Sequence, residues 1–305
     1  MPIGKVVDEI GKVYPSVTPS SLRFLEREGL IVPTRTPGGH RLYSPADVRR
    51  ILQIKEWQAQ RLSLEEIRHR LEQRDRLPDP AVLTETFLEE VLAGNVETAR
   101  RTVLAADDVG MSLSQTFSEV IEPALIQVGQ GWEAGTILVA QEKTVSELVR
   151  DLIAELAHRH TPAESFGPVI IAACVSGERH ELGLRMIVAL LRAEGLRVQY
   201  LGADVDAAFL LEAVRLHQPA AVLLSARNEH HLRALEESMA RLRNELGEGE
   251  LPVIVVGGLL AQTHADVLKT LGVVPITGAN ASEAMQRAVQ ILEPVIGRTS
   301  EGSEG

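Results

Sequence analysis

The chain has 305 residues, of which 45% are hydrophobic and 24% are charged, so its composition excludes wholesale disorder. At about 100–200 residues per domain, this length predicts two or three domains. No apolar run approaches the roughly 18 residues that cross a bilayer, and the first residues lack a signal-peptide core, which predicts a cytoplasmic protein with no membrane partner. The single cysteine, Cys174, excludes a disulfide framework and any multi-cysteine metal site.

The net charge of −11 is distributed unevenly along the chain. Residues 1–76 contain 14 Lys and Arg against 10 Asp and Glu, whereas residues 77–305 contain 17 against 32. A basic segment on an acidic body predicts that the first part binds a polyanion and that the second part does not.

Residues 1–76 are predicted to form a small, mainly helical domain. Helices are expected at 3–12 and 19–28, the second capped by Thr18 and started by a proline. Residues 31–43 fit a hairpin that turns at Pro37-Gly38-Gly39, and two further helices begin near residues 44 and 63. This order of elements is a winged helix-turn-helix, a fold that binds DNA.

Polar side chains on this domain are placed for contact with DNA phosphates. The N-terminus of the second helix offers backbone N–H groups that favour phosphate, and the hairpin offers side-chain donors. The candidate contacts to double-stranded DNA are Thr18, Ser20, Ser21 and Arg23 on the helix, and Arg35, His40, Arg41 and Tyr43 on the hairpin.

Residues 80–160 show only helical periodicity. Four helical segments are expected, at 81–92, 95–107, 112–130 and 136–159, and the loops between them are short. This pattern predicts an antiparallel four-helix bundle.

Residues 167–297 alternate between β-branched runs and helices. Strands are expected at 168–175, 196–201, 221–225, 252–256 and 274–277, with helices near residues 182, 206, 229 and 262 and at 282–295. Alternating βα units predict an α/β domain of the Rossmann or flavodoxin-like kind, with a doubly wound, five-stranded parallel sheet whose ligands bind at the carboxyl ends of strands. Residues 298–305 are predicted to form a disordered tail.

One histidine lies where such a sheet binds its ligand. His180 follows the first strand of the domain, and Glu178 precedes it by two residues. A carboxylate in that place can accept a hydrogen bond from the ring nitrogen that does not face a metal, which fixes the tautomer of a metal-binding imidazole.

The N-terminal sequence resembles the MerR family of DNA-binding regulators. The resemblance covers nearly all of residues 3–73 and is carried by LRFLEREGLI at 22–31, RTPGGHRLY at 35–43 and DVRR at 47–50. One departure is the segment at 11–17, which is longer than the usual turn between the first two helices.

Residues 166–295 resemble the cobalamin-binding domains of the methionine-synthase type. Their signature Asp-x-His-x-x-Gly, Ser-x-Leu and Gly-Gly is matched by Glu178-x-His180-x-x-Gly183, Ser225-x-Arg227 and Gly257-Gly258. The resemblance implies that His180 ligates cobalt from below and that the displaced dimethylbenzimidazole tail enters the sheet. It also implies that Ser225 binds this tail and that the two glycines leave room for it.

The order of the three domains resembles the CarH/LitR family of photoreceptor repressors. In that family a Trp and a Glu ten positions later cap the adenosyl face of cobalamin, a spacing that Trp132 and Glu142 keep. Lys143 and Glu133 stand where family histidines occur. The resemblance implies a non-enzymatic repressor that binds adenosylcobalamin, forms a homo-oligomer (dimer or tetramer) on DNA in darkness, and releases DNA in light.

Two other functions remain open. The chain could sense cobalamin without light through another upper ligand, as in methylcobalamin or hydroxocobalamin, an alternative motivated by Glu133 and Lys143. It could also be the corrinoid carrier of a methyltransferase, although the DNA-binding head argues against that function.

Overall fold

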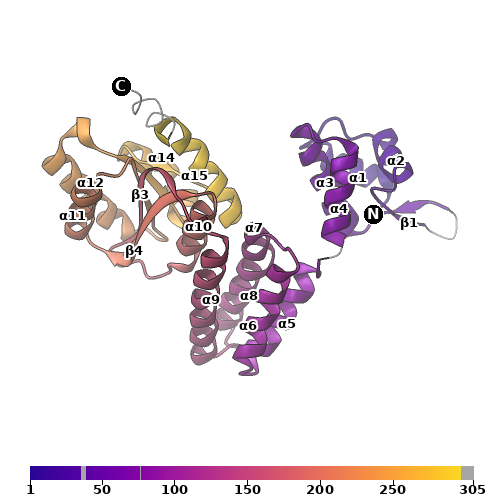
Figure 1. The fold of residues 1–305 in the computed structure, drawn as a ribbon, viewed down its shortest axis with the longest axis horizontal. Helices are drawn as coiled ribbons and strands as arrows, with labels where there is room; N and C mark the ends of the chain where they lie inside the picture. The colour runs from indigo at the N-terminus through magenta and orange to yellow at the C-terminus, as the bar shows by residue number, and fades with distance from the viewer. Residues whose placement is uncertain (36–38, 76, 297–305) are drawn as a thin grey trace. The chain divides into compact units, whose positions relative to one another are not determined.

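The computed structural model describes residues 1–35, 39–75 and 77–296 (Figure 1). The chain separates into two compact units, Met1–Leu77 and Pro78–Gly305, which are described separately. The expected turn at Pro37-Gly38 and the expected tail at 298–305 lie outside the described residues. The finer division into domains at 1–76, 80–160 and 167–297 stays a proposal.

The first unit has the predicted order of helices and a short hairpin. Thr18 caps the second helix by accepting a hydrogen bond from the Ser21 backbone N–H at 3.1 Å, and Leu22, Ile51 and Ile67 are fully buried in the core. The two strands pair antiparallel, Thr34 with Leu42. The elements are α1 (Ile3–Ile10), α2 (Pro19–Arg27), β1 (Thr34–Arg35), β2 (Arg41–Leu42), α3 (Pro45–Ala59) and α4 (Leu64–Asp75).

The second unit begins with the predicted four-helix bundle. Its elements are α5 (Pro80–Leu92), α6 (Val96–Asp108), α7 (Leu113–Gln115), η1 (Thr116–Ile121), α8 (Glu122–Glu133) and α9 (Val139–His160). The third predicted helix contains a π-helical stretch, η1, ahead of Pro123. Proline has no N–H and its ring crowds the preceding turn, which widens the helix there. The Thr84 hydroxyl donates to the Pro80 carbonyl at 2.9 Å and also lies 3.4 and 3.3 Å from the carbonyl oxygens of Glu119 and Val120 in this stretch.

The sheet that follows is parallel throughout, as predicted. The strands are β3 (Phe166–Val175), β4 (Leu196–Val205), β5 (Ala221–Ser225), β6 (Val253–Gly257) and β7 (Val274–Pro275), in the spatial order β4-β3-β5-β6-β7. This order places the second strand at one edge and the first beside the third, which is the flavodoxin-like arrangement. The sequence-based fold class is therefore confirmed.

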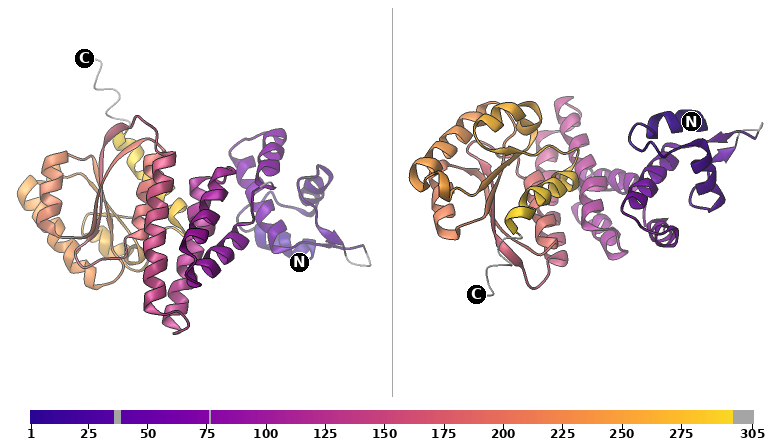
Figure 2. Two further views of the ribbon diagram at one scale, coloured as in Figure 1. Left: turned by 60° about the horizontal axis from the view of Figure 1, so that its bottom comes forward. Right: turned by 90° about the horizontal axis from the view of Figure 1, so that it is seen from above.

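Helices cover both faces of the sheet (Figures 1 and 2). They are α10 (Leu182–Ala193), α11 (Ala207–His217), α12 (His230–Leu246), α13 (Leu259–Thr263), α14 (Ala265–Thr270) and α15 (Ala281–Ile296). Side chains alternate along each strand: Leu223 packs with α10 and α15, whereas Val222 and Leu224 pack with α11 and α12. The helix expected near residue 262 begins at Leu259 instead, directly after Gly257-Gly258.

The bundle packs against one face of the α/β layer. Helix α9 lies along α10, and the two helices share one hydrophobic core with α15 (Figure 2). Polar contacts cross the same boundary: Ser114 Oγ lies 2.6 Å from Ser282 Oγ, and Arg150 Nε donates to Glu181 Oε1 at 2.9 Å. Across the described ranges, no helix combines the length and the apolar character needed to span a membrane.

Candidate functional site

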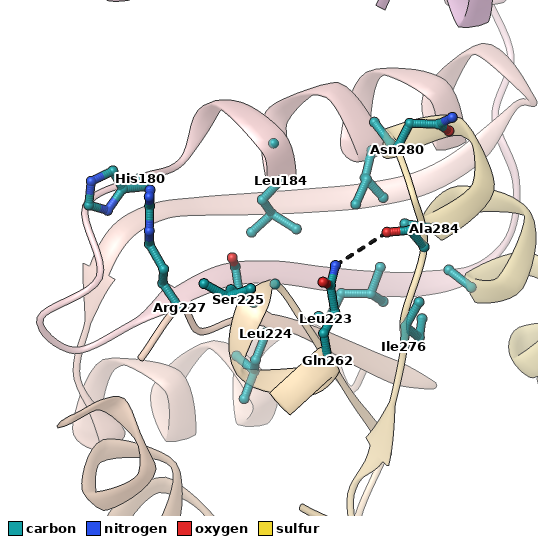
Figure 3. Close-up of a pocket in the computed structure, with 18 of the residues that line it drawn as sticks. His180, Leu184, Leu223, Leu224, Ser225, Arg227, Gln262, Ile276, Asn280 and Ala284 are labelled. Atoms are coloured by element: carbon teal, nitrogen blue, oxygen red, sulfur yellow. Dashed lines mark hydrogen bonds between the residues drawn. The ribbon is translucent and has the colours of Figure 1, made fainter. Parts of the chain in front are cut away.

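A cavity of about 400 Å³ lies at the carboxyl ends of β5 and β6, beneath α10 and α15 (Figure 3). Its deeper wall is apolar and includes Leu184, Leu223, Val255 and Ile276. Six of the residues that were singled out from the sequence line it: Glu178, His180, Gly183, Ser225, Gly257 and Gly258. They come from three segments of the chain, at or just after the carboxyl ends of β3, β5 and β6, which meet because parallel strands end at the same edge of a sheet.

His180 is held in one tautomer by a buried carboxylate. Glu178 Oε1 accepts the His180 backbone N–H at 2.7 Å and also lies 2.7 Å from the ring Nδ1. Glu178 is 1% exposed, whereas the His180 side chain is 70% exposed. With its proton on Nδ1, the imidazole presents the Nε2 lone pair, the form of histidine that binds a metal.

Glu178 keeps one oxygen without a partner. Oε2 is buried and accepts no hydrogen bond within the described part of the chain. His231 Nδ1 lies 3.4 Å away, but it accepts the Arg227 backbone N–H at 3.0 Å and so carries no proton for Glu178. The hydrogen bonds that Glu178 accepts from side chains and backbone therefore come from His180, which fixes the orientation of the ring.

The metal-binding side chains at the cavity suit a metal ion that is already coordinated by a ligand other than the protein. Within the described ranges, no group of three or more His, Cys, Asp or Glu side chains could hold a bare ion. A single exposed imidazole beside a deep apolar cavity instead fits a metal inside a macrocycle, which needs one axial ligand from the protein.

The glycine pair makes room at the mouth of the cavity. A Cβ atom on Gly258 would lie 2.4 Å from the Ala226 carbonyl oxygen, and its φ of +91° lies in the region that glycine favours. No atom lies within 4 Å of the Cβ position of Gly257 or Gly183. Gly257 and Gly183 thus leave open space beside the cavity, whereas Gly258 is required by its φ and by the close approach of the Ala226 backbone.

The bundle contributes a carboxyl group that the sequence analysis missed. Glu122 lines the cavity, and its Oε1 accepts the Ala281 N–H at the start of α15 at 2.8 Å. Its other oxygen is buried without a partner, and burial raises the pKa of Glu122 to about 7. An acidic residue inside the apolar run at 120–125 was the available signal.

Replacing Glu122 with Gln is expected to flatten the dependence of stability on pH. The folded chain keeps this proton up to about pH 7, whereas the unfolded carboxyl loses it near its ordinary pKa of 4.5. Stability therefore falls by ~3 kcal/mol as pH rises through this window, and a neutral amide removes that fall. Thermal melts at pH 5 and pH 8 measure this fall in stability. Glu89→Gln, on the exposed face of α5, is the control. Equal pH dependence in wild type and Glu122→Gln would contradict the burial effect.

The structure does not bring Trp132 and Glu142 to the cavity lining. Trp132 lies near the end of α8 and is 51% exposed. Glu142 lies in the first turn of α9, where Oε1 accepts from Ser146 Oγ at 2.8 Å and Oε2 pairs with Lys143 Nζ at 3.2 Å. The role of Trp132 and Glu142 as a cap over a bound group stays a prediction. An exposed Trp at a helix end is a surface that a planar ligand could cover.

In the first unit, the helix-cap residues are already engaged. Ser21 Oγ donates to the Thr18 carbonyl, and Thr18 Oγ1 accepts the Ser21 N–H, so both side chains stabilise the start of α2. Ser20 and Arg23 are exposed at the same end of the helix. His40 is exposed on the hairpin. The DNA contacts expected at Ser20, Arg23 and His40 stay predictions.

Glu26 fixes the hairpin against α2, a role that the sequence analysis missed. Its carboxylate binds Arg35 Nη2 at 2.8 Å and Arg41 Nε, and the Arg41 hydrogen bond is the main cause that lowers the Glu26 pKa. Ion pairs therefore place the two arginines beside α2, where the Arg35 side chain is still 55% exposed and that of Arg41 is 27% exposed.

Tyr43 is not a surface donor, which corrects the sequence-based expectation. The residue is 1% exposed, its hydroxyl is buried, and its ring belongs to the core of the first unit. Burial raises its pKa. In a domain with few aromatic residues, the free energy gained by packing this large ring exceeds the cost of removing its hydroxyl from water.

Comparisons with known proteins cover both units. A family model described as "MerR HTH family regulatory protein" matches residues 1–74, and two models described as "B12 binding domain" match residues 83–157 and 168–286. The HTH-type transcriptional repressor CarH of Myxococcus xanthus is 34% identical over 81% of this chain and 86% of that protein. The HTH-type transcriptional repressor CarA of the same organism is 30% identical over 90% of this chain and 92% of that protein.

Corrinoid proteins match the second unit. The solved structure of the Methanosarcina barkeri monomethylamine corrinoid protein aligns with a TM-score of 0.58 at 20% identity, covering 69% of this chain and 99% of that one. This similarity supports the assignment of a helical bundle followed by a parallel α/β domain.

Proposed function

Because the chain belongs to the family of MerR-type, cobalamin-binding transcriptional repressors represented by CarH, we propose that a bound corrinoid and light control its binding to DNA. The observation that supports the corrinoid half is the single imidazole of His180, oriented by buried Glu178 at the mouth of an apolar cavity. We further propose that the protein acts in the cytoplasm on double-stranded operator DNA and catalyses no reaction.

The chain would hold the corrinoid from both sides. His180 Nε2 would ligate cobalt, with Glu178 fixing the ring, and the cavity would receive the dimethylbenzimidazole tail. Ser225 closes β5 at the cavity wall, where its hydroxyl would hydrogen-bond this tail. Trp132 and Glu142 would cover the opposite, adenosyl face through ring stacking and hydrogen bonds to the ribose.

The cofactor would absorb the light, and the protein would respond with a change in its affinity for DNA. When bound, adenosylcobalamin supplies absorption of visible light and a weak cobalt–carbon bond. In darkness, Trp132 and Glu142 would hold the bundle in the form that oligomerises. Several basic heads then bind one operator together, which multiplies the affinity of each through effective concentration. Without an adenosyl group to cover, Trp132 and Glu142 would no longer hold the bundle in that form, so the oligomer and its DNA would separate.

One alternative keeps the corrinoid and omits light. Lys143 pairs with Glu142, and Glu133 is exposed at the end of α8, where family members have histidines. The chain could accordingly respond to methylcobalamin or hydroxocobalamin in darkness. A corrinoid carrier of a methyltransferase, the other alternative, does not explain the regulatory domain matched at residues 1–74.

Selection of bound sequences from a random double-stranded DNA library tests the proposal. Parallel selections use adenosyl-, methyl- and hydroxocobalamin and no corrinoid, all in darkness. We expect enrichment of a site with two-fold symmetry only with adenosylcobalamin, because symmetric oligomers read symmetric half-sites. Equal enrichment with all three corrinoids would favour the light-independent alternative, and no enrichment in any arm would contradict a repressor.

Replacing Arg23 with Gln is expected to weaken binding to the selected operator and to reduce its salt dependence. Arg23 is exposed beside the N-terminus of α2. Each phosphate contact that is lost lowers the slope of log affinity against log salt by about 0.9, so the slope should fall by roughly that amount per bound head. Fluorescence anisotropy between 50 and 300 mM salt measures this slope. Arg101→Gln, an exposed position in α6, is the charge-matched control, and an unchanged slope in Arg23→Gln would remove Arg23 from the interface.

A further inference from the structure

Arg227 stands at the mouth of the cavity, in the loop that follows β5. Figure 3 shows its side chain extending toward His180 at one end of the cavity, while Asn280 lies at the other end. Ser225, two residues earlier, lines the wall between them. A ligand group that passes from His180 into the cavity therefore passes Arg227 first.

The backbone around Arg227 is fixed, so the position of the side chain is not accidental. The Arg227 N–H donates to Nδ1 of His231, which is 7% exposed. The neighbouring Ala226 N–H donates to the Gly257 carbonyl at 3.1 Å, and the Ala226 carbonyl accepts from Leu260 at 3.2 Å. Backbone hydrogen bonds thus hold this loop against the glycine pair and the start of α13. The Arg227 guanidinium extends from the loop toward His180.

The charges that line the cavity leave Arg227 without a counterion. The ionisable residues in the lining are Glu122, Glu178, His180 and Arg227. A histidine that ligates a metal is a neutral imidazole, so Arg227 supplies the permanent positive charge at this mouth. Within the described ranges its guanidinium has no hydrogen bond and no carboxylate within 4 Å, whereas Arg150 binds Glu181 and Arg287 binds Glu283.

The tail of cobalamin carries a complementary charge. Its nucleotide loop joins the corrin ring to the base through one phosphodiester, which is anionic at neutral pH. Arginine matches phosphate oxygens with two parallel N–H donors, and this geometry makes it the preferred side chain for such groups. We propose that Arg227 binds the phosphodiester of the nucleotide loop, and so selects complete cobalamins over corrinoids that lack this loop. This inference rests on the corrinoid binding proposed above.

Comparing two ligands distinguishes binding of the phosphodiester from binding of the corrin ring. Adenosylcobinamide has the same ring, cobalt and upper ligand as adenosylcobalamin but lacks the nucleotide loop. We expect Arg227→Gln to weaken adenosylcobalamin binding about tenfold or more, measured by absorbance titration in darkness, and to leave adenosylcobinamide binding within about twofold. Arg227→Lys should retain most of the affinity for adenosylcobalamin. Arg233→Gln, at an 85% exposed position in α12 outside the cavity, controls for the change in net charge.

Each outcome is decisive. Unchanged cobinamide binding by Arg227→Gln shows that the variant keeps a folded corrinoid site. An equal loss for both ligands would place Arg227 on the ring or give it a role in the loop fold, and no loss for either would make it a solvated surface arginine; both results overturn the inference while leaving corrinoid binding intact. Failure of the wild-type chain to bind either ligand would instead overturn the proposed function, and this inference with it.

Discussion

Replacing His180 with alanine is expected to lower the affinity for adenosylcobalamin by more than about 100-fold. Changes to groups that only orient a metal ligand cost about 10–100-fold, so loss of the ligand itself should exceed that range. No neighbouring side chain can take its place, because the described residues offer no second His or Cys in the cavity lining. Equilibrium dialysis of the full chain in darkness measures the change.

A matched control separates ligation from surface charge. His230 is exposed at the start of α12 and does not line the cavity, so His230→Ala should bind the corrinoid as the wild type does. Because the His180 side chain is 70% exposed, its removal leaves no core cavity and the chain should stay folded; the melting temperature should fall modestly, since buried Glu178 loses the hydrogen bond from the ring. Retention of adenosylcobalamin by His180→Ala within about threefold of wild type would contradict ligation by His180.

Illumination of the chain loaded with adenosylcobalamin is expected to reduce operator affinity by about 100-fold or more. A linked set of heads gains about 10²–10⁴-fold over a single head, and separation of the oligomer forfeits that gain. Size-exclusion chromatography should show a dimer or tetramer in darkness and a smaller species after green light. Anisotropy with the selected operator should show the fall in affinity in the same samples.

The chain loaded with hydroxocobalamin is the control, because it has no adenosyl group to lose and should elute identically before and after light. Trp132→Ala tests the protein side of the switch. It removes the exposed ring at the end of α8 while leaving His180 in place, so corrinoid should still bind but the dark oligomer should be lost. Identical elution and operator affinity in dark and light with adenosylcobalamin would reject light as the signal and favour the light-independent sensor.

The parts of the fold that were predictable depend on local signals. Thr18 and Ser44 cap helices that begin with proline, and β-branched runs mark the strands, so element type and order follow from short stretches of sequence. The π-helical stretch before Pro123 was not predictable, since it involves the hydroxyl of Thr84, more than thirty residues away in the chain. The burial of Tyr43 likewise depends on how α1, α2 and α3 pack together.

The candidate site was predictable where strand ends determine it. His180, Ser225 and Gly257 all follow or close parallel strands, so the sheet brings them together. Glu122 and Glu26 were missed because each acts on a partner from another element: Glu122 contacts α15 from the bundle, and Glu26 in α2 holds two hairpin arginines. Such pairings between distant segments leave no periodicity in the sequence.

We propose that the imidazole of His180 replaces the corrinoid's own base on cobalt. Electron paramagnetic resonance of the chain loaded with the cobalt(II) corrinoid tests it directly, because the spectrum is split by the nuclear spin of the axial nitrogen. Protein labelled with ¹⁵N-histidine should show a doublet where unlabelled protein shows a triplet, and His180→Ala should lose the doublet. A triplet that persists in the labelled protein would mean that dimethylbenzimidazole remains bound to cobalt, and would contradict ligation by His180.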